Sequence, residues 1–158
     1  MRHVPCRARD DDGAPVALTD EEQERWRATL RDQMTRTPYI GGLGIVIEEW
    51  STAGARLRLP FAAHLTNDGK AFHGGAVASL VDTAGAAAVW AGHDYDKGMR
   101  AATVSLTVNY TGAGRATDLV ADAVCVKRGK DLAFSEIRVS DAEGRGVATG
   151  TLVYRIVP

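Results

Sequence analysis

The stretch from Gly74 to Ala91 limits most strongly what this chain can fold into. It holds eighteen residues, ten of them Gly or Ala, and its one charged side chain is Asp82, near the middle. No proline interrupts it, and Ala, Leu and Val recur at the three- and four-residue spacing of a buried helix. The sequence therefore predicts one long, nearly uncharged helix over these residues.

On a helical wheel, the carboxylate of this helix lies among the smallest side chains. The larger apolar residues share one face, formed by Val77, Leu80, Val81 and Ala84. The other face is formed by Gly75, Ala78, Ser79, Asp82, Gly85 and Ala86. Small side chains allow a close approach, so we expect a sheet, a partner helix or a substrate to contact this second face.

Three interpretations of this helix differ in what the carboxylate does. A transmembrane helix is disfavoured, because the Gly and Ala content makes the segment weakly apolar and a central Asp costs roughly 2.5 to 3.5 kcal/mol on insertion scales. A core helix with a paired, inert Asp82 and a core helix whose Asp82 takes part in a reaction both remain. Taken alone, a carboxylate on a buried helix is more often structural.

The composition indicates a single soluble globular domain, with 158 residues, 45% of them apolar and 25% charged. A net charge of −1 argues against a nucleic-acid partner. Cys6 and Cys125 form no disulfide or metal-binding pattern, and the first fifteen residues contain no apolar signal segment. We therefore expect a cytoplasmic protein without a metal site and without a membrane partner.

The chain begins with an arm and a second helix. Residues 1–17 are charged and lack periodicity, which predicts a mobile arm ahead of one domain over residues 18–158. Thr19 and Glu22 have the spacing of a capping box. Apolar residues follow at helical spacing, namely Trp26, Leu30 and Met34. We expect a helix over about residues 19–36, packed as a lid on the body of the domain.

Six segments are predicted as β-strands, the first three from period-two alternation and the others from Val and Ala content and the turns between them. They are residues 45–50, 55–61, 102–110, 119–128, 132–140 and 146–157. In the third, one face is expected to hold Val104, Leu106, Val108 and Tyr110, and the other Thr103, Ser105, Thr107 and Asn109. Short turns join neighbouring strands, which makes them antiparallel. The predicted fold is α+β, a six-stranded antiparallel sheet that curls around the long helix.

Two groups on the long helix have the properties of a reaction site. Gly74 and Gly75 leave the N–H groups of its first turn accessible, where the helix dipole is positive, as in an oxyanion hole. Asp82 lies about two turns further along, roughly 10 to 11 Å at 1.5 Å per residue. The two groups are too far apart to act on one atom within a subunit. We therefore expect a symmetric dimer to bring Asp82 of one copy near Gly75 of the other.

The residues around this helix follow the pattern N-x5-HGG-x6-D, formed by Asn67, His73, Gly74, Gly75 and Asp82. The pattern resembles that of the hotdog-fold acyl-CoA thioesterases, in the PaaI-like, or thioesterase-superfamily-member-2-like, subgroup. The resemblance extends to A-T-V-S-L-T-V-N-Y and to K-R-G-K-D-L-A-F, and it covers about residues 41–157. It implies a hotdog fold, with an N-terminal helix that is less general to the family.

The resemblance also implies a role for each residue of the pattern. Asp82 would be the nucleophile or the base that activates water, and the Gly75 N–H would polarise the thioester carbonyl. Asn67 would orient the water or the thioester, and His73 would hold the loop or contact the thioester. Thr103 would place the water or the carboxylate. Further contacts to substrate or coenzyme A are expected from Gly74, Ser79, Lys127, Arg128 and Lys130.

Each of these residues also has a purely structural interpretation. His73 can cap the helix, an interpretation that stands beside a direct catalytic part. Asn67 can form a turn, and Thr103 can be an ordinary strand residue. The basic turn over residues 127–130 is most simply a solvated hairpin tip, although it also suits a clamp for the phosphates of coenzyme A. Two other histidines are expected at the surface, His64 and His93.

The resemblance implies an enzyme that hydrolyses an acyl-CoA thioester to the free acid and CoA. The acyl group would be aromatic or medium-chain, coenzyme A would enter as part of the substrate, and no metal or redox cofactor is implied. Family members place their sites at a homodimer interface, and many pair into homotetramers. The alternative is a non-catalytic acyl-CoA-binding or sensing protein on the same fold. A hydratase is disfavoured because its Asp/His arrangement is not found in the sequence.

Overall fold

The computed structural model describes residues 16–158, so most of the predicted arm over residues 1–17 lies outside the described residues. The helices are α1 (Asp20–Met34), α2 (Pro38–Leu43) and α3 (Gly74–Ala91), with 3₁₀ turns η1 (Ala63–Leu65) and η2 (Tyr95–Lys97). The strands are β1 (Val46–Ser51), β2 (Gly54–Leu59), β3 (Arg100–Tyr110), β4 (Leu119–Arg128), β5 (Leu132–Asp141) and β6 (Gly146–Val157).

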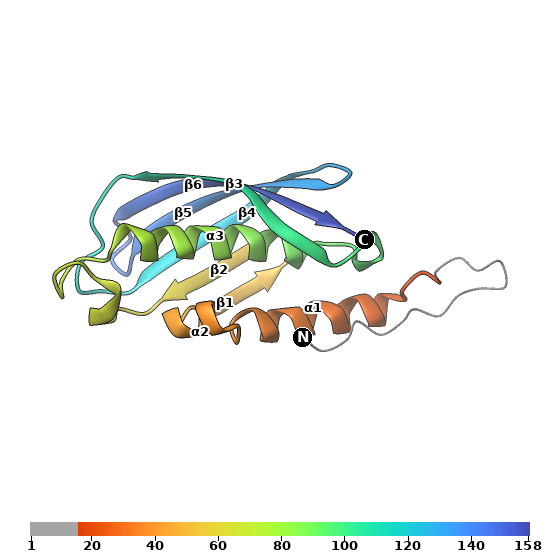
Figure 1. The fold of residues 1–158 in the computed structure, drawn as a ribbon, viewed down its shortest axis with the longest axis horizontal. Helices are drawn as coiled ribbons and strands as arrows, with labels where there is room; N and C mark the ends of the chain where they lie inside the picture. Colours follow the sequence, from red (N-terminus) through yellow and green to blue (C-terminus); the bar gives the residue numbers. More distant parts are fainter. Residues whose placement is uncertain (1–15) are drawn as a thin grey trace.

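The six strands form one antiparallel sheet in the order β1-β2-β4-β5-β6-β3. Figure 1 shows the sheet curling over one side of α3, with α1 lying along β1. Because β3 pairs with β6 rather than with β4, β1 and β3 are the two edges of the sheet. The predicted α+β architecture, with a long helix enclosed by six antiparallel strands, is confirmed.

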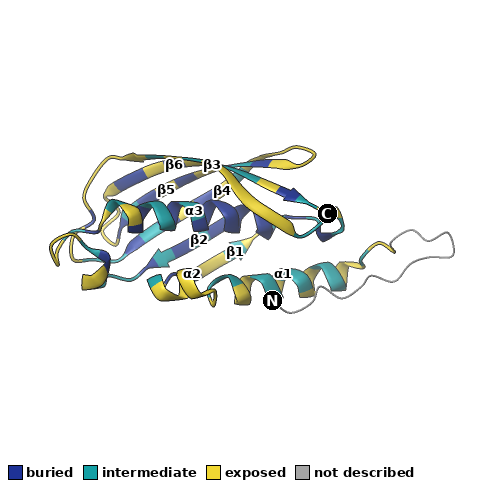
Figure 2. Ribbon diagram, in the orientation of Figure 1, coloured by how far each residue is buried: buried dark blue, intermediate teal, exposed yellow. Residues whose placement is uncertain are grey.

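Helix α3 is the centre of the hydrophobic core, as Figure 2 shows by its buried residues. It has the length and composition of a membrane span, but 72% of it is buried inside the fold. The sheet approaches α3 closely at two glycines, one on β6 and one on α3 itself. A Cβ added to Gly150 of β6 would lie 2.4 Å from Val81 Cγ1, and one added to Gly85 would lie 2.8 Å from Leu152 Cδ2. The sheet therefore packs against the part of the small-residue face that contains Gly85.

Helix α1 begins with the predicted capping box, in which the Glu22 N–H donates to Thr19 Oγ1 and Thr19 N–H donates to Glu22. It ends at Met34, two residues earlier than expected. Its Trp26, Leu30 and Met34 pack against the second half of α3, as predicted for a helix that covers the body.

A short helix, α2, follows α1 and was not predicted from the sequence. Pro38 occupies its first turn, where a missing N–H costs no hydrogen bond, and Gly44 ends it in the left-handed region at φ 74°. Glycines at positions 41 and 42 are poor helix formers, so the local sequence carried no periodic signal for this turn and a half.

Strand β3 contains a β-bulge that changes which side chains face the helix. Its register with β6 shifts between Thr103 and Ser105, so Thr103 pairs with Tyr154 and Ser105 with Val153. Leu106 and Val108 pack against the core, yet Thr103 also faces α3. The expected grouping, which put Thr103 on the face opposite to the apolar residues, is therefore wrong. One inserted residue moves the alternation out of phase.

Candidate active site

The carboxylate of Asp82 and the hydroxyl of Thr103 form the centre of the candidate site. Thr103 Oγ1 donates to Asp82 Oδ1 at 2.7 Å, which joins the middle of α3 to the edge strand β3. Asp82 is half-buried, whereas Thr103 is exposed. No side chain or backbone group among residues 16–158 donates to Asp82 Oδ2 within hydrogen-bond distance. One carboxylate oxygen is thus held in place, and the other is available to a water or a substrate.

Tyr154 extends this centre toward the core, and sequence reasoning missed it. Trp90 Nε1 donates to the Tyr154 hydroxyl at 3.2 Å, and Tyr154 faces Thr103 across the β3–β6 pair. Burial raises the pKa of Tyr154 above its ordinary value, the Trp90 N–H works against the rise, and the negative charge of Asp82 adds to it. Tyr154 therefore keeps its proton beside the carboxylate. Tyr154 lies two residues from both Leu152 and Ile156 on β6, and this period-two spacing could have predicted that it faces the core.

The first turn of α3 forms a second group. His73 is the N-cap, and its Nδ1 accepts a hydrogen bond from the Gly75 N–H at 2.9 Å. The capping interpretation of His73 is therefore realised. To donate to an oxyanion, the Gly75 N–H would have to break its hydrogen bond to His73 Nδ1 and bond to the substrate oxygen instead. The Tyr110 hydroxyl donates to the Gly74 carbonyl at 3.0 Å, so β3 also anchors this end of the helix.

Asn67 lies in the exposed loop before α3, and its side chain is not what shapes the turn. Asp68 Oδ1 accepts from the N–H groups of Lys70 and Ala71, each at 2.9 Å, and Gly69 adopts φ 79°. Those backbone N–H donors, that of Ala71 first, hold the pKa of Asp68 below its ordinary value. Because Asp68 fulfils the turn-forming role, the Asn67 carboxamide is left for another contact.

Ser79 lies between the two groups on α3. Its Oγ donates to the Gly75 carbonyl at 2.8 Å and shares a hydrogen bond of 2.7 Å with the Tyr39 hydroxyl. Tyr39 comes from α2, so this unpredicted helix contacts the small-residue face of α3 at Ser79. The sequence offered no signal for Tyr39, because α2 itself was not foreseen.

One chain does not bring the two groups together. His73, Gly74 and Gly75 lie at the start of α3 and Asn67 in the loop before it, whereas Asp82, with Thr103 bonded to it, lies roughly 10 Å further along the helix axis. Both groups are accessible from outside. A reaction that uses both on one substrate atom needs a second subunit.

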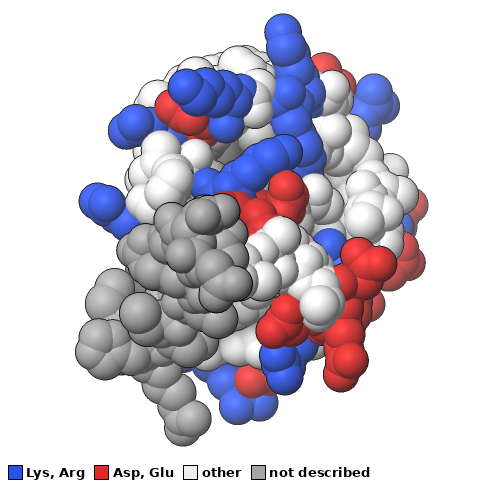
Figure 3. Space-filling model, turned by 90° about the vertical axis from the view of Figure 1, so that its right-hand side faces the viewer, with Lys and Arg blue, Asp and Glu red and all other residues white. Residues whose placement is uncertain are grey.

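The basic turn between β4 and β5 divides into two kinds of residue. Arg128 Nη2 donates to the Val89 carbonyl at 2.7 Å and to the Ala88 carbonyl at 3.4 Å, near the end of α3. Its guanidinium therefore stabilises the negative end of the helix, in contrast to its expected role as a free phosphate ligand. Lys127 and Lys130 are exposed. Figure 3 shows Lys and Arg side chains gathered over this end of the molecule.

His93 is the one expected surface histidine that the structure buries. Its Nε2 lies 2.8 Å from the Gly98 carbonyl, and its ring packs edge-on against Trp90 and Tyr95. Burial lowers its pKa below the ordinary value. Among residues 16–158, no group of three or more His, Cys, Asp or Glu side chains is arranged to hold a metal ion.

The enclosed helix, the six-stranded sheet and the carboxylate in mid-helix together define a hotdog-fold protein. The chain belongs to the thioesterase superfamily, whose family model matches residues 69–148. A candidate esterase of Halobacterium salinarum is 37% identical over an alignment of 148 residues, and the match covers 88% of this chain and 97% of that protein. The predicted family is therefore confirmed.

Solved structures show the same fold. The Escherichia coli PaaI protein, from the phenylacetic acid degradation operon, superimposes with a TM-score of 0.68 at 23% identity, over 85% of this chain and 98% of that one. A hypothetical thioesterase of Streptococcus pneumoniae, solved with coenzyme A, gives 0.67 at 20% identity, over 81% and 96%. At these identities the likeness shows the fold, and the predicted hotdog architecture is confirmed.

Proposed function

We propose that the protein hydrolyses an acyl-CoA thioester to the free acid and CoA, with an aromatic or medium-chain acyl group. Membership of the thioesterase superfamily supports hydrolysis as the reaction class. The observation that carries the assignment of the site is the Thr103–Asp82 hydrogen bond, which orients a carboxylate at an accessible position on the central helix.

In the proposed reaction, Asp82 acts on the thioester carbonyl in one of two ways. As a base, it takes a proton from a water whose oxygen bonds to the carbonyl carbon. As a nucleophile, it bonds to that carbon itself, and water then hydrolyses the anhydride. In both, the carbon–sulfur bond breaks and CoA leaves as a thiolate that takes up a proton. By donating to Oδ1, Thr103 leaves Oδ2 as the reacting oxygen.

The oxyanion is proposed to form at the first turn of α3 of a second copy, where the positive end of the helix dipole lies. Two observations support a dimer with shared sites. Asp82 and Gly75 are roughly 10 Å apart along one helix. The edge strand β3 is exposed along most of its length and carries Val104 and Tyr110, which are 57% and 55% exposed. Pairs of such dimers would form the expected homotetramer.

The phosphates of coenzyme A are proposed to bind at the basic end of the molecule. Lys97, Arg128 and Lys130 line a depression of about 80 Å³ beside the β4–β5 turn. Lys97 is partly neutralised by Asp94, 3.6 Å away, and Arg128 is held by α3. Lys130 and the neighbouring Lys127 are therefore the cations that we propose as the main ligands of a phosphate.

The test is release of free thiol from aromatic and aliphatic acyl-CoAs by wild type and Asp82→Asn. We expect turnover by wild type and a loss of at least two orders of magnitude in kcat in the variant. Asp122→Asn, an exposed carboxylate on β4 that pairs with Arg56, is the matched control and should keep full activity.

Thermal unfolding of both variants shows whether they are folded. Full activity of a folded Asp82→Asn protein would contradict the assignment of Asp82. Binding of acyl-CoA without turnover of any thioester would instead establish a non-catalytic acyl-CoA-binding protein.

A further inference from the structure

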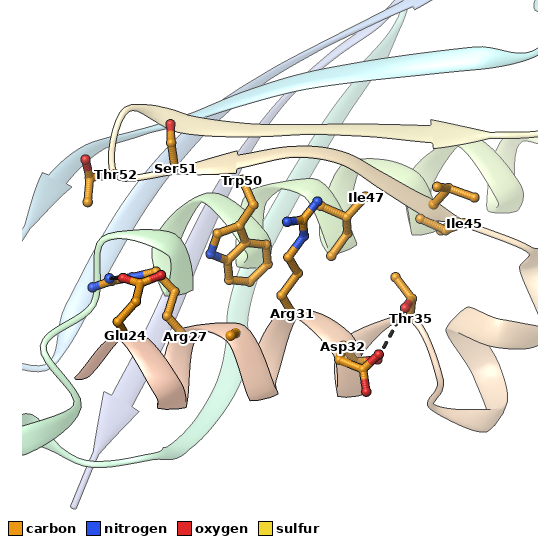
Figure 4. A pocket seen from close by; sticks show the side chains of 12 residues that line it. Glu24, Arg27, Arg31, Asp32, Thr35, Ile45, Ile47, Trp50, Ser51 and Thr52 are labelled. Carbon is orange, nitrogen blue, oxygen red and sulfur yellow. Dashed lines mark hydrogen bonds and ion pairs between the residues drawn. The ribbon is translucent and has the colours of Figure 1, made fainter. Parts of the chain in front are cut away.

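A groove of about 540 Å³ lies between α1 and the edge strand β1, away from Asp82. Figure 4 shows side chains from both elements pointing into it. It is lined by Glu24, Arg27, Ala28, Arg31, Asp32, Thr35, Ile45, Val46, Ile47, Trp50, Ser51 and Thr52. None of these residues belongs to the candidate active site. The volume is within the range of small-molecule sites, about 300 to 1,000 Å³.

The wall of the groove formed by β1 is apolar at one end. Ile45 and Ile47 lie there, both buried, and Asp32 and Thr35 face this end from α1 (Figure 4). The indole of Trp50 hangs from β1 in the middle, and its nitrogen edge is turned toward Arg27 (Figure 4). Arg31 rises from α1 beside the same indole. An occupant with an apolar body and a polar head would match this division.

The polar end has donors without acceptors. Among residues 16–158, Trp50 Nε1 and Arg27 Nε are buried nitrogen atoms without a hydrogen-bond partner. Buried N–H groups normally have one, so the pair signals a missing acceptor.

The carboxylates of the groove do not supply that acceptor. Glu24 pairs with Arg27 Nη1, at the far end of the guanidinium from Nε, and Asp32 pairs with Arg36 Nη2 at 2.7 Å. Arg31 makes no ion pair within the described part of the chain. The groove therefore offers two unused N–H donors and one unpaired positive charge.

We propose that this groove binds a small monocarboxylic acid with an apolar body. A rotation of the Trp50 and Arg27 side chains turns the buried Nε1 and Nε toward the carboxylate oxygens, which accept from them, and Arg31 adds its positive charge. The apolar body lies along Ile45 and Ile47. A neutral molecule of the same shape would leave Arg31 unpaired and satisfy fewer donors, so the site selects for the anion.

The experiment is a titration of the full chain with octanoate, followed by the indole signals in ¹H–¹⁵N spectra. The chain has three tryptophans, and Trp50→Phe assigns the Trp50 signal. We expect this signal to move downfield, as its N–H gains an acceptor. The Trp90 N–H is bonded to Tyr154 beside Asp82, so its signal reports on the active site. Movement of the Trp90 signal alone, or of neither signal, would overturn the proposal.

Two comparisons test the polar head. Octan-1-ol, which has the same apolar body without the charge, should bind at least tenfold more weakly than octanoate. Arg31→Gln should weaken octanoate binding about tenfold, whereas Arg25→Gln should not change it, since Arg25 is on α1 but outside the groove. Equal affinity for acid and alcohol, or equal effects of the two substitutions, would overturn the proposal. The melting temperature of each variant verifies folding.

Discussion

The hydroxyl of Thr103 reaches the carboxylate of Asp82 because β3 is bulged immediately after Thr103. Without the extra residue, the alternation that turns Leu106 and Val108 toward α3 would turn Thr103 away from it. The bulge thus lets one strand pack its apolar side chains on the core and still aim a hydroxyl at the carboxylate. Bulges are used in this way beside active sites in many sheets.

We expect Thr103→Val to lower kcat about ten- to a hundredfold while leaving the fold intact. Valine keeps the shape of threonine but cannot donate to Asp82, and a hydrogen bond to a charged group is worth about 1.5 to 3 kcal/mol. Steady-state kinetics with the best acyl-CoA of the panel measures the change. Thr103→Ser, which restores a hydroxyl, should recover most of the rate; equal rates for the Val and Ser variants would exclude an orienting role of the hydroxyl.

Mixed dimers should recover activity from two inactive chains. If each site combines Asp82 of one copy with the α3 start of the other, a dimer of Asp82→Asn and Asn67→Ala chains contains one intact site. Co-refolding equal amounts should return about a quarter of wild-type activity, since half of the dimers are mixed and each has one working site. Each variant refolded alone is the control. Two inactive chains that stay inactive when mixed would place the whole site within one subunit.

Arg128→Met should destabilise the fold by about 1 kcal/mol, because methionine keeps an apolar stem but leaves the Ala88 and Val89 carbonyls without their cation. Lys130→Met, two residues away on the same turn, should leave the free energy of unfolding unchanged and weaken only coenzyme A binding. Urea unfolding and CoA titration of both variants separate the two roles. An unchanged stability in Arg128→Met would show that the guanidinium does not support the helix end.

Burial of His93 should make part of the stability depend on pH. Its pKa is lowered in the folded protein, first by burial and further by the charge of Arg128, although the bond to the Gly98 carbonyl works against this. As the pH falls through about 6.5, the unfolded chain takes up a proton before the folded chain does. This contribution to stability is therefore complete above about pH 6.5 and decreases below it.

Thermal unfolding of wild type and His93→Gln at about pH 7.5 and 5.5 measures this dependence. We expect the melting temperature of wild type to fall more between the two values than that of the variant, whose side chain does not titrate. An equal fall in both proteins would assign the acid sensitivity to other groups.

Much of the architecture could be predicted from local patterns. The composition and spacing of residues 74–91 indicate a buried helix, and alternation, Val and Ala content and turn residues together locate all six strands within a few residues. The capping box of Thr19 and Glu22 correctly marks the start of α1. Such patterns can be recognised in the sequence because burial and backbone hydrogen bonding act over a few neighbouring residues.

Other features of the site could not be read in this way. Helix α2 contains two glycines and has no periodic face, so neither it nor the contact of Tyr39 with Ser79 was foreseen. Arg128 looked like one of several solvated cations, because nothing in its own segment indicates that the end of α3 lies beside it. His93 looked like a surface residue for the same reason.

By itself the sequence determined the long helix, its single carboxylate, the six strands and the HGG turn that begins the helix, since each depends on the chemistry of residues close together in the chain. Tertiary structure alone decided which groups meet that carboxylate. Thr103 and Tyr154 lie 51 residues apart, yet pairing of β3 with β6 sets them side by side, and the bulge in β3 turns Thr103 inward. Strand order and register are set by the packing of the whole sheet on α3, and no local pattern encodes them.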